Sequence, residues 1–529
     1  MKNDGITDVF RDERALWKAD LGNGYYKNPI LYADYSDPDV IRVGEDFYMI
    51  ASSFHMSPCL PILHSKDLVN WTLIHHVMEK LPYSRYDLPR HGEGVWAPSI
   101  RYHDGEYWIF FATPDEGVFM CKTNDPSGKW SEPHLVKEAK GWIDPCPFWD
   151  NDGNAYLVHA FAKSRSGIKS QLQICKMKQD GTGLLDEGKI IFNGKDHHPT
   201  IEGPKMYKRN GYYYIFAPAG GVTDGWQTVL RSESIMGPYQ DKVVLEQGDT
   251  DINGPHQGGW VETKEGESWF IHFQDKGAYG RITHLQPLYW KKDWPVIGEE
   301  RKEGVGEPVL SWKKPKISHS AIKNEIIVPQ TSDMFDKNSL GLQWQWQANQ
   351  KRDWWEVIAK ENRLRLHAIS TMKKDKTLYN LPHILTQKFS APAFTATTSL
   401  FFQPQMDNDY AGLIVLGQRY KGITVKRYGA EWNIVIVDGE HTKDTTREHE
   451  EIVYRTNDIP RYFRVEVKSQ AVCQFAFSTN GEQFISVGDL FQATPGRWIG
   501  AQLGIFCVHK GEGKSSGYTD FHWLQLTNE

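Results

Sequence analysis

Short runs of alternating apolar and polar residues dominate the first 300 positions, and they recur in a shared order. Each of five segments begins with Pro, passes through a short apolar run and a turn rich in Gly, Asp or Asn, and ends in an aromatic-rich run. The segments start at Pro38, Pro98, Pro145, Pro204 and, more loosely, Pro255. Alternation with a period of two predicts strands, and the turn residues predict a hairpin inside each segment.

The spacing of these prolines indicates a repeat architecture. Successive prolines are about 60, 47, 59 and 51 residues apart, near the blade period of a β-propeller. A meander of unrelated hairpins is the alternative, but five similar units without helical periodicity between them favour a five-bladed propeller. We therefore predict an all-β protein whose propeller covers residues 28–311, after an N-terminal extension over residues 1–27.

The pattern changes after the propeller. Residues 312–330 are rich in Lys and Pro and are predicted to form a linker. Beyond it the strands are longer and are separated by Asn-Gly and Asp-Gly turns. Such strands predict an antiparallel β-sandwich over residues 331–529, and about 200 residues can bury a core of their own.

Charge and composition narrow the classes of partner. The chain has 61 Lys and Arg against 67 Asp and Glu, a net charge of −6, which argues against a nucleic-acid binder. No apolar run approaches the roughly 18 residues of a membrane helix, so no membrane partner is expected. Aromatic residues make up 13% of the chain. Aromatic rings fill β cores, and exposed ones stack on flat apolar ligand faces such as those of sugars.

The N-terminal sequence and the cysteines predict a cytoplasmic location. The first residues are polar and lack the apolar segment of about 7–15 residues that a secretory signal contains. The six cysteines are scattered and have no CxxC spacing, which fits reduced thiols and gives no support for a cysteine metal site. A secreted or periplasmic location remains the alternative if the sequence is that of a mature chain.

Three carboxylates occupy related places in the repeat. The innermost strands of a propeller run along its central channel, so equivalent residues of each blade converge there. The residues before the repeated prolines are Asp37, Ala97, Asp144, Glu202 (one Gly removed from its Pro) and Gly254. Asp before Pro is also ordinary turn chemistry. A carboxylate that served only the fold should recur in every blade, whereas these differ, so we predict a functional ring.

Paired carboxylates beside aromatic rings suit glycoside hydrolysis. One carboxyl must stay protonated to donate to the leaving oxygen, and another must stay ionised to activate water. A third negative charge can raise the pKa of the acid. Motifs of other hydrolytic and phosphate chemistries give no support here. HExxH and GxxxxGK[ST] are absent, and the one GxSxG match, at residues 513–517, does not stand between a strand pattern and a helix pattern as a nucleophile elbow would.

These motifs resemble glycoside hydrolase family 43. The likeness covers roughly residues 28–529 and rests on NPILYADYSDPDVIRVGEDFYMIASSF, VWAPSIRYHDGEYWIFFA, WIDPCPFWDNDGNAYLVH, IEGPKMYKRNGYYYIFAPAGG and GRITHLQPLYWKKDWPVIG. LPHILTQKFSAP, DNDYAGLIV and TDFHWLQL are similar to the sandwich of its β-xylosidase branch. The family implies an inverting mechanism in which Asp37 is the general base and Glu202 the general acid. Asp144 would raise the pKa of Glu202 and orient it.

The resemblance also implies substrate-binding residues. Trp96 and Phe54 match aromatic pocket walls, with packing in the core as the alternative. Arg281 of GRIT is similar to the family arginine that reaches substrate hydroxyls, with a structural ion pair as the alternative. The third blade departs from the usual motif at Cys146-Pro147, which puts the neighbouring pocket wall in question.

For cofactors, the resemblance implies calcium and no organic group. His256 of GPHQGGWVET is similar to the family histidine near a calcium ion on the propeller axis, with a hydrogen-bonded core histidine as the alternative. Asp333 and Asp520 match acidic positions near the ends of the sandwich, where related proteins can bind calcium.

The resulting prediction is an exo-acting glycosidase that removes terminal pentoses from plant cell-wall oligosaccharides. β-D-Xylosidase is the first candidate and α-L-arabinofuranosidase the second, acting on xylo- or arabinoxylo-oligosaccharides. A non-catalytic sugar-binding propeller is the alternative of another class, and the three carboxylates argue against it. A fructosidase would carry WMNDPNG-like and RDP motifs, which are absent. The sequence leaves open whether the protein is a homo-oligomer.

Overall fold

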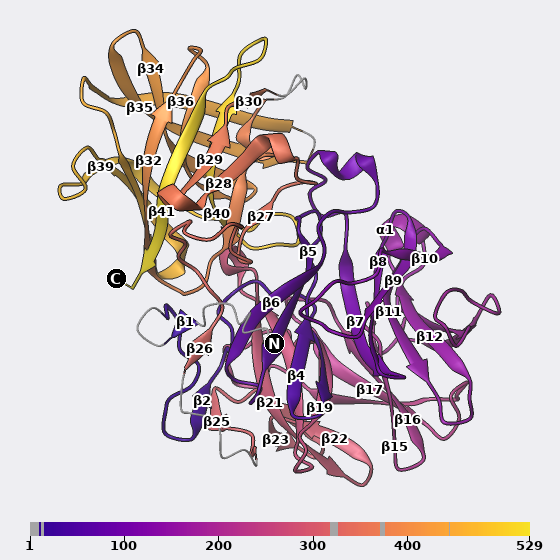
Figure 1. Cartoon of the computed structure of the whole chain (residues 1–529). Coiled ribbons are helices and arrows are strands. Elements are labelled where there is room, and N and C mark those ends of the chain that lie inside the picture. The colour runs from indigo at the N-terminus through magenta and orange to yellow at the C-terminus, as the bar shows by residue number, and fades with distance from the viewer. Residues whose placement is uncertain (1–9, 12–14, 318–325, 371–375, 444, 529) are drawn as a thin grey trace, which may run out of the picture.

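The computed structural model of the chain describes residues 10–11, 15–317, 326–370, 376–443 and 445–528. Two β-rich bodies lie next to each other (Figure 1), with the first, in indigo to pink, built from the N-terminal part of the chain. The second body, in orange to yellow, is C-terminal. This arrangement confirms the all-β prediction of a propeller followed by a sandwich.

Five antiparallel sheets form the propeller, and the strands of each follow the chain in order. Blade 1 contains β3 (Asp39–Val43), β4 (Asp46–Ile50), β5 (Cys59–Ser65) and β6 (Trp71–Met78). Blade 2 contains β7 (Trp96–His103), β8 (Glu106–Thr113), β9 (Gly117–Thr123) and β10 (His134–Glu138). Blade 3 contains β11 (Trp142–Trp149), β12 (Ala155–Phe161), β13 (Gln171–Met177) and β14 (Lys189–Asn193). A single helical turn, α1 (Lys163–Ser166), follows β12.

Blades 4 and 5 complete the ring. Blade 4 contains β15 (Lys205–Arg209), β16 (Tyr212–Ala219), β17 (Trp226–Ser232) and β18 (Gln240–Leu245), and β24 (Val305–Glu307) and β23 (Glu299–Lys302) extend it. Blade 5 contains β19 (His256–Glu262), β20 (Ser268–Asp275), β21 (Arg281–Lys291) and β22 (Trp294–Ile297). The first strand of blade 5 contacts the first strand of blade 1, so side-chain packing closes the circle. Each predicted proline segment gives the first hairpin of one blade.

The predicted extension and linker are partly folded against each other. Strand β2 (Tyr25–Lys27) pairs with β25 (Ser311–Lys313), and β1 (Phe10–Arg11) pairs with β26 (Ile327–Val328). The chain thus brings the start of the propeller domain and its exit together. Residues 1–9 and 12–14 of the predicted extension and 318–325 of the predicted linker lie outside the described residues.

Two antiparallel sheets form the sandwich. One contains β27 (Gln345–Trp346), β31 (Leu385–Lys388), β40 (Gln502–His509), β33 (Asp409–Leu416), β34 (Arg419–Tyr428), β35 (Glu431–Thr442) and β36 (Thr445–Thr456), with β30 (Ile369–Ser370) beside β40. The other contains β28 (Trp355–Ile358), β29 (Arg363–His367), β41 (Tyr518–Thr527), β32 (Phe394–Gln403), β37 (Tyr462–Lys468), β38 (Val472–Ser478) and β39 (Ile485–Gln492). Alternate residues of both sheets, such as Phe463 and Ile505, meet in a common core.

The two domains share buried surface. Ala278, Tyr279 and Ile282 of the propeller belong to the same apolar cluster as the core of the sandwich. Ser57 and Trp346 exchange two backbone hydrogen bonds across the boundary, with N···O distances of 3.0 and 2.6 Å. Burial of this kind fixes the two domains relative to one another.

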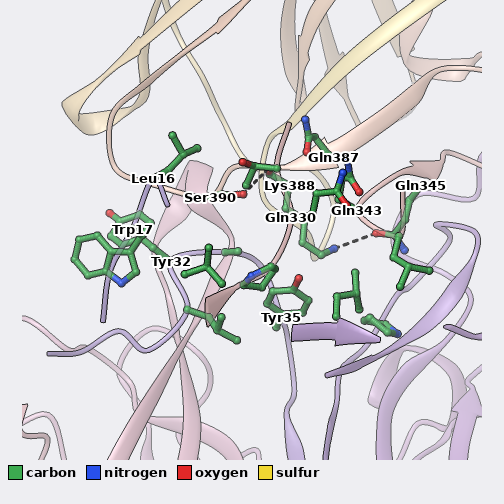
Figure 2. Close-up of a pocket in the computed structure, with 18 of the residues that line it drawn as sticks. Leu16, Trp17, Tyr32, Tyr35, Gln330, Gln343, Gln345, Gln387, Lys388 and Ser390 are labelled. Carbon is green, nitrogen blue, oxygen red and sulfur yellow. Dashed lines mark hydrogen bonds between the residues drawn. The ribbon is translucent and has the colours of Figure 1, made fainter. Parts of the chain in front are cut away.

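The boundary also contains a cavity of about 50 Å³ lined by residues from both domains. Figure 2 shows Tyr35 on the propeller side, with Gln345 and Lys388 on the sandwich side. The Nζ atom of Lys388 donates a hydrogen bond of 3.1 Å to Gln345. The two domains therefore bury charged and polar groups where they meet.

Two further sequence expectations concern thiols and membranes. All six cysteines are buried free thiols, as their scattered spacing predicted. Over the described ranges, no helix combines the length and the apolar character needed to cross a membrane.

Candidate active site

A pocket of about 340 Å³ opens at one end of the propeller channel and receives residues from all five blades. The three predicted carboxylates, Asp37, Asp144 and Glu202, all line it. Phe54, Trp96, His256 and Arg281 line it as well. The structure therefore brings together every sequence-predicted site residue of the propeller.

An unusual backbone conformation positions two of the carboxylates. Asp37 and Asp144 each precede a repeated proline and each have φ of 56°. Gly203 and Gly254 occupy the equivalent places in blades 4 and 5, with φ of 59° and 46°. The left-handed region is strained for a non-glycine residue before proline. In blade 4 glycine takes this position, so Glu202 is one residue out of register with the two aspartates.

β-Bulges turn further side chains toward the pocket. The pairing of the first two strands shifts between Trp96 and Ser99 in blade 2 and between Ile143 and Cys146 in blade 3. A third shift lies at Gln257 in blade 5. A bulge inserts an unpaired residue and re-aims its side chain. Asp144 and Gln257 both lie at such shifts.

Asp37 lies in a polar, charged environment. Its side chain is buried, and its Oδ2 accepts hydrogen bonds from the hydroxyls of Ser36 (2.8 Å) and Ser52 (2.6 Å). Arg281 Nη1 lies 3.2 Å from Oδ1 and 3.4 Å from Oδ2. Both hydroxyls donate to Oδ2, so Oδ1 can still accept a proton from water.

Asp144 lies deeper than Glu202. It is 2% exposed, and its Oδ2 accepts a hydrogen bond of 2.8 Å from the backbone N–H of Gly203. Burial, and then the neighbouring charge of Glu202, raise the pKa of Asp144 to about 8. The sequence predicted that Asp144 raises the pKa of Glu202, whereas the raised pKa in this structure is that of Asp144. A raised pKa at Glu202 stays a prediction.

Glu202 presents its carboxylate to the pocket. Its side chain is 26% exposed, and its Oε1 lies 3.0 Å from Nε2 of His256. The imidazole of His256 is almost fully buried, and its Nδ1 has no hydrogen-bond partner. His256 thus orients Glu202 in this structure.

The donor set does not fit the predicted calcium at His256. Ca²⁺ is bound by six to eight oxygen atoms. Among the described residues, no group of three or more His, Cys, Asp and Glu side chains could hold a metal ion. One unpartnered imidazole nitrogen is a poor calcium ligand, so the reaction is derived below without a metal.

The two sandwich aspartates are engaged by protein donors. Asp333 accepts hydrogen bonds from the Phe335 N–H (2.9 Å) and the Trp344 indole (2.9 Å). Asp520 forms ion pairs with Arg363 (2.8 Å) and Arg365 (2.7 Å). Neither aspartate lines the pocket. At Asp520, two guanidinium groups contact the oxygens that were predicted to bind calcium. The structure gives no support to a metal at either residue.

The pocket wall is aromatic, and one part of it comes from the sandwich. The rings of Phe54 and Trp96 meet edge to face with centroids 6.4 Å apart, and Trp96 meets Trp498 at 6.2 Å. The guanidinium of Arg281 lies 5.5 Å from the centre of the Trp498 ring. Trp498 has φ of 66°, which marks a strained loop position at a functional wall.

Sequence reasoning missed Trp498 and Gln257. Trp498 lies in GRWIG, between β39 and β40, more than 200 residues from the repeat that revealed the propeller site. Its only local signal is a tryptophan flanked by glycines in a loop. Gln257 follows His256, and its Nε2 is buried without a partner. Only the bulge in blade 5 shows that its side chain faces the pocket.

Comparison with known proteins assigns both domains to families. The family "Glycosyl hydrolases family 43" matches residues 26–295, and "Beta xylosidase C-terminal Concanavalin A-like domain" matches residues 332–527. The chain belongs to glycoside hydrolase family 43.

Individual relatives of this family member extend over nearly the whole chain. A protein of Xylanibacter ruminicola named as a β-xylosidase is 39% identical over 92% of this chain and 86% of its own length. A β-xylosidase of Formosa agariphila is 31% identical over 98% and 92%. A non-reducing end α-L-arabinofuranosidase of Bacteroides ovatus is 27% identical over 97% of each chain.

A solved structure shares both domains of this family member. The GH43 protein BlXynB of Bacillus licheniformis superposes with a TM-score of 0.79 at 25% identity. The match covers 96% of this chain and 100% of that protein. The propeller–sandwich pair is therefore shared as one unit.

Proposed function

We propose that this glycoside hydrolase is an exo-acting, inverting β-D-xylosidase. The observation that carries the proposal is that one pocket brings together Asp37, which accepts hydroxyl and guanidinium hydrogen bonds, and the partly exposed Glu202 beside the buried Asp144. Such a division of environments is what acid–base hydrolysis of a glycoside requires.

Glu202 is assigned as the general acid. Glu202 and Asp144 repel each other, so the pair keeps one proton well above the usual pKa of an aspartate. Of the two, only Glu202 is exposed enough to reach a leaving oxygen, since Asp144 is 2% exposed. Asp144 holds the Gly203 N–H and thereby fixes the residue after Glu202.

Asp37 is assigned as the general base. Two hydroxyls donate to its Oδ2, and Oδ1, which the Arg281 guanidinium also contacts at 3.2 Å, is the oxygen left to accept a water proton. The water loses its proton to Asp37 and attacks the anomeric carbon as the bond to the leaving oxygen breaks. Glu202 gives its proton to that oxygen, so each carboxyl ends in the opposite protonation state.

The walls favour one small sugar. A volume of about 340 Å³, bounded by three carboxyl groups and the rings of two phenylalanines and two tryptophans, suits a single terminal residue. Phe54, Trp96 and Trp498 offer apolar faces, and Arg281 offers N–H donors for hydroxyl groups. This supports the predicted exo action on xylo-oligosaccharides.

α-L-Arabinofuranosidase is the second candidate. The two pentoses are alike in size and in number of hydroxyl groups, and one relative is named for each activity. The higher identity to proteins named as β-xylosidases favours xylose.

The test is a panel of 4-nitrophenyl glycosides, with the first product anomer followed by NMR. We expect β-xyloside to be hydrolysed fastest, α-L-arabinofuranoside next, and α-xylose to appear first from the β-xyloside. Initial release of β-xylose would contradict inversion. Faster hydrolysis of the arabinofuranoside would select the second candidate, and no hydrolysis of any glycoside would overturn the function.

A further inference from the structure

Asp34 is a buried carboxylate that sits behind the pocket and takes no direct part in the proposed reaction. Its side chain is 4% exposed and lies three residues before Asp37. Its Oδ1 accepts a hydrogen bond of 2.9 Å from the backbone N–H of Arg281. Its Oδ2 accepts one of 2.8 Å from the backbone N–H of Gly500.

The two residues that donate these N–H groups lie beside different parts of the pocket. Arg281 begins β21, and its guanidinium contacts both oxygens of Asp37. Gly500 belongs to the sandwich and follows Trp498 by two residues. A single carboxylate thus connects the arginine that holds the proposed base to the loop that supplies the sandwich wall.

The packing around Asp34 leaves little freedom. Gly280 has φ of 73°, and a Cβ there would lie 2.5 Å from Cγ of Asp34. A Cβ on Gly500 would lie 2.7 Å from the backbone nitrogen of Gly280. The Ala501 N–H also donates a hydrogen bond of 2.7 Å to the Ala278 carbonyl. The sandwich loop is therefore in direct backbone contact with the start of β21.

The charge of Asp34 is compensated across the domain boundary. Burial raises the pKa of Asp34, while the charge of Lys388 and the two N–H donors favour its ionised form. Lys388 is on the sandwich strand β31 and lines the cavity beside Tyr35 (Figure 2). Each domain thus contributes one buried charge to the contact.

We propose that Asp34 is a positioning residue that couples docking of the sandwich to the geometry of the catalytic pocket. When its two oxygens hold Arg281 and Gly500, Trp498 and the Arg281–Asp37 pair are placed together. When one bond is lost, both sides of the pocket shift. This inference rests on the proposed function of the pocket but not on which pentose it binds.

The first test is Asp34→Asn, which keeps the size of the side chain and replaces one acceptor by an NH₂ that faces a backbone N–H. Asp409→Asn is the matched control. Asp409 is fully buried and also accepts two backbone N–H bonds, from Gln405 and Met406, but it lies inside the sandwich away from the pocket. We expect kcat/KM of Asp34→Asn to fall at least tenfold, with kcat and KM both changed. Asp409→Asn should lower Tm and leave kcat/KM within twofold of wild type.

A double-mutant cycle tests whether Asp34 affects activity through the Trp498 loop. If Asp34 acts through the Trp498 loop, Asp34→Asn should cost much less activity in a Trp498→Ala background than in the wild type. If the fold-losses in kcat/KM of the two single variants simply multiply in the double variant, the two residues act independently and the coupling is refuted. A kcat/KM of Asp34→Asn within twofold of wild type, or a loss no larger than that of Asp409→Asn, would also refute it.

Gly500→Ala gives a second approach if Asp34→Asn does not fold. Its added methyl group meets the backbone of Tyr279 and Gly280 first, so it must push the loop away from the start of β21 while the Asp34 side chain is left unchanged. We expect the same fall in kcat/KM with a native propeller, and unchanged activity would overturn the proposal. Each assay uses whichever glycoside the wild-type enzyme cleaves best. Failure of the wild type on every glycoside would therefore refute the proposed function, whereas an active wild type with variants of unchanged kcat/KM would refute only the role of Asp34.

Discussion

At the scale of single residues, Asp37 and Glu202 share a pocket but not an environment. Asp37 receives hydroxyl and guanidinium donors, whereas Glu202 faces a buried aspartate and an imidazole. Because opposite surroundings favour opposite protonation states, the two carboxyls should fail in different ways when they are removed.

Glu202→Ala and Asp37→Ala should therefore show different dependence on the leaving group. Loss of the acid should slow natural xylobiose by about 10²–10⁴-fold and an activated aryl xyloside much less, because a good leaving group needs little protonation. Loss of the base should slow both substrates alike. Steady-state kcat/KM for the two substrates measures this. Equal slowing of both by Glu202→Ala would move the acid to Asp144.

Asp144→Asn should change the pH dependence of stability. The native state holds a proton on Asp144 up to a pKa of about 8, while the unfolded state releases it above about pH 4. The unfolded state is therefore increasingly favoured as pH rises between these values, and Asn removes this penalty. We expect a higher Tm for Asp144→Asn at pH 7.5, by about 2–4 °C per kcal/mol relieved, and no gain at pH 4.

The same variant should be nearly inactive, and its remaining activity should have its optimum at lower pH, because the charge that keeps a proton on the pair is gone. Asp150→Asn is the control. Asp150 follows the other end of β11 and pairs with Lys208 outside the pocket, so its loss should not raise Tm at pH 7.5. Thermal scans between pH 4 and pH 8 measure how Tm depends on pH. An equal change of Tm with pH in wild type and Asp144→Asn would refute the raised pKa of Asp144.

At the scale of elements, the site residues lie at the start of the first strand of each blade, where left-handed residues and β-bulges interrupt the regular strand. The hairpins were predictable, because turn residues and alternation are local signals. The left-handed residues and the bulges were not, since they depend on how neighbouring blades pack around the channel. For this reason the sequence placed Glu202 in register with Asp37 and Asp144, although Gly203 holds the equivalent backbone position.

Gly203→Ala tests the importance of that bend. Ala is strained at φ of 59°, and its Cβ would lie 2.8 Å from the side chain of Gln257. The N–H of the same residue binds Asp144. We expect kcat/KM to fall at least tenfold. Gly211→Ala is a matched control, because Gly211 has φ of 83° in the next turn and open space around it. Both variants should lose stability, but Gly211→Ala should keep wild-type kcat/KM.

At the scale of the whole molecule, the pocket is incomplete without the sandwich. Asp37, Asp144 and Glu202 were found from the propeller repeat, and Phe54 and Trp96 from the resemblance to the family. Trp498 was not, because a contact between distant parts of the chain leaves no periodic signal in either part. The metal predictions share this limit, since a resemblance identifies a residue but not the partners that already occupy its oxygens, as the two arginines do at Asp520.

The closed wall leads to a prediction about products. Because Trp498 and Trp96 meet at 6.2 Å across the domain boundary, the sandwich closes the pocket on that side, and we expect a long chain to enter from the other side only. The enzyme should therefore remove one xylose at a time from the non-reducing end. With xylo-oligosaccharides labelled at the reducing end, chromatography of early time points should show only xylose and chains one unit shorter. Trp498→Ala should raise KM by about tenfold, which corresponds to a loss of about 1.4 kcal/mol of contact with the sugar, and should preserve stability of the propeller. Early appearance of internal fragments from the wild-type enzyme would contradict the closed pocket, because such fragments require substrate to extend past the sandwich wall in both directions.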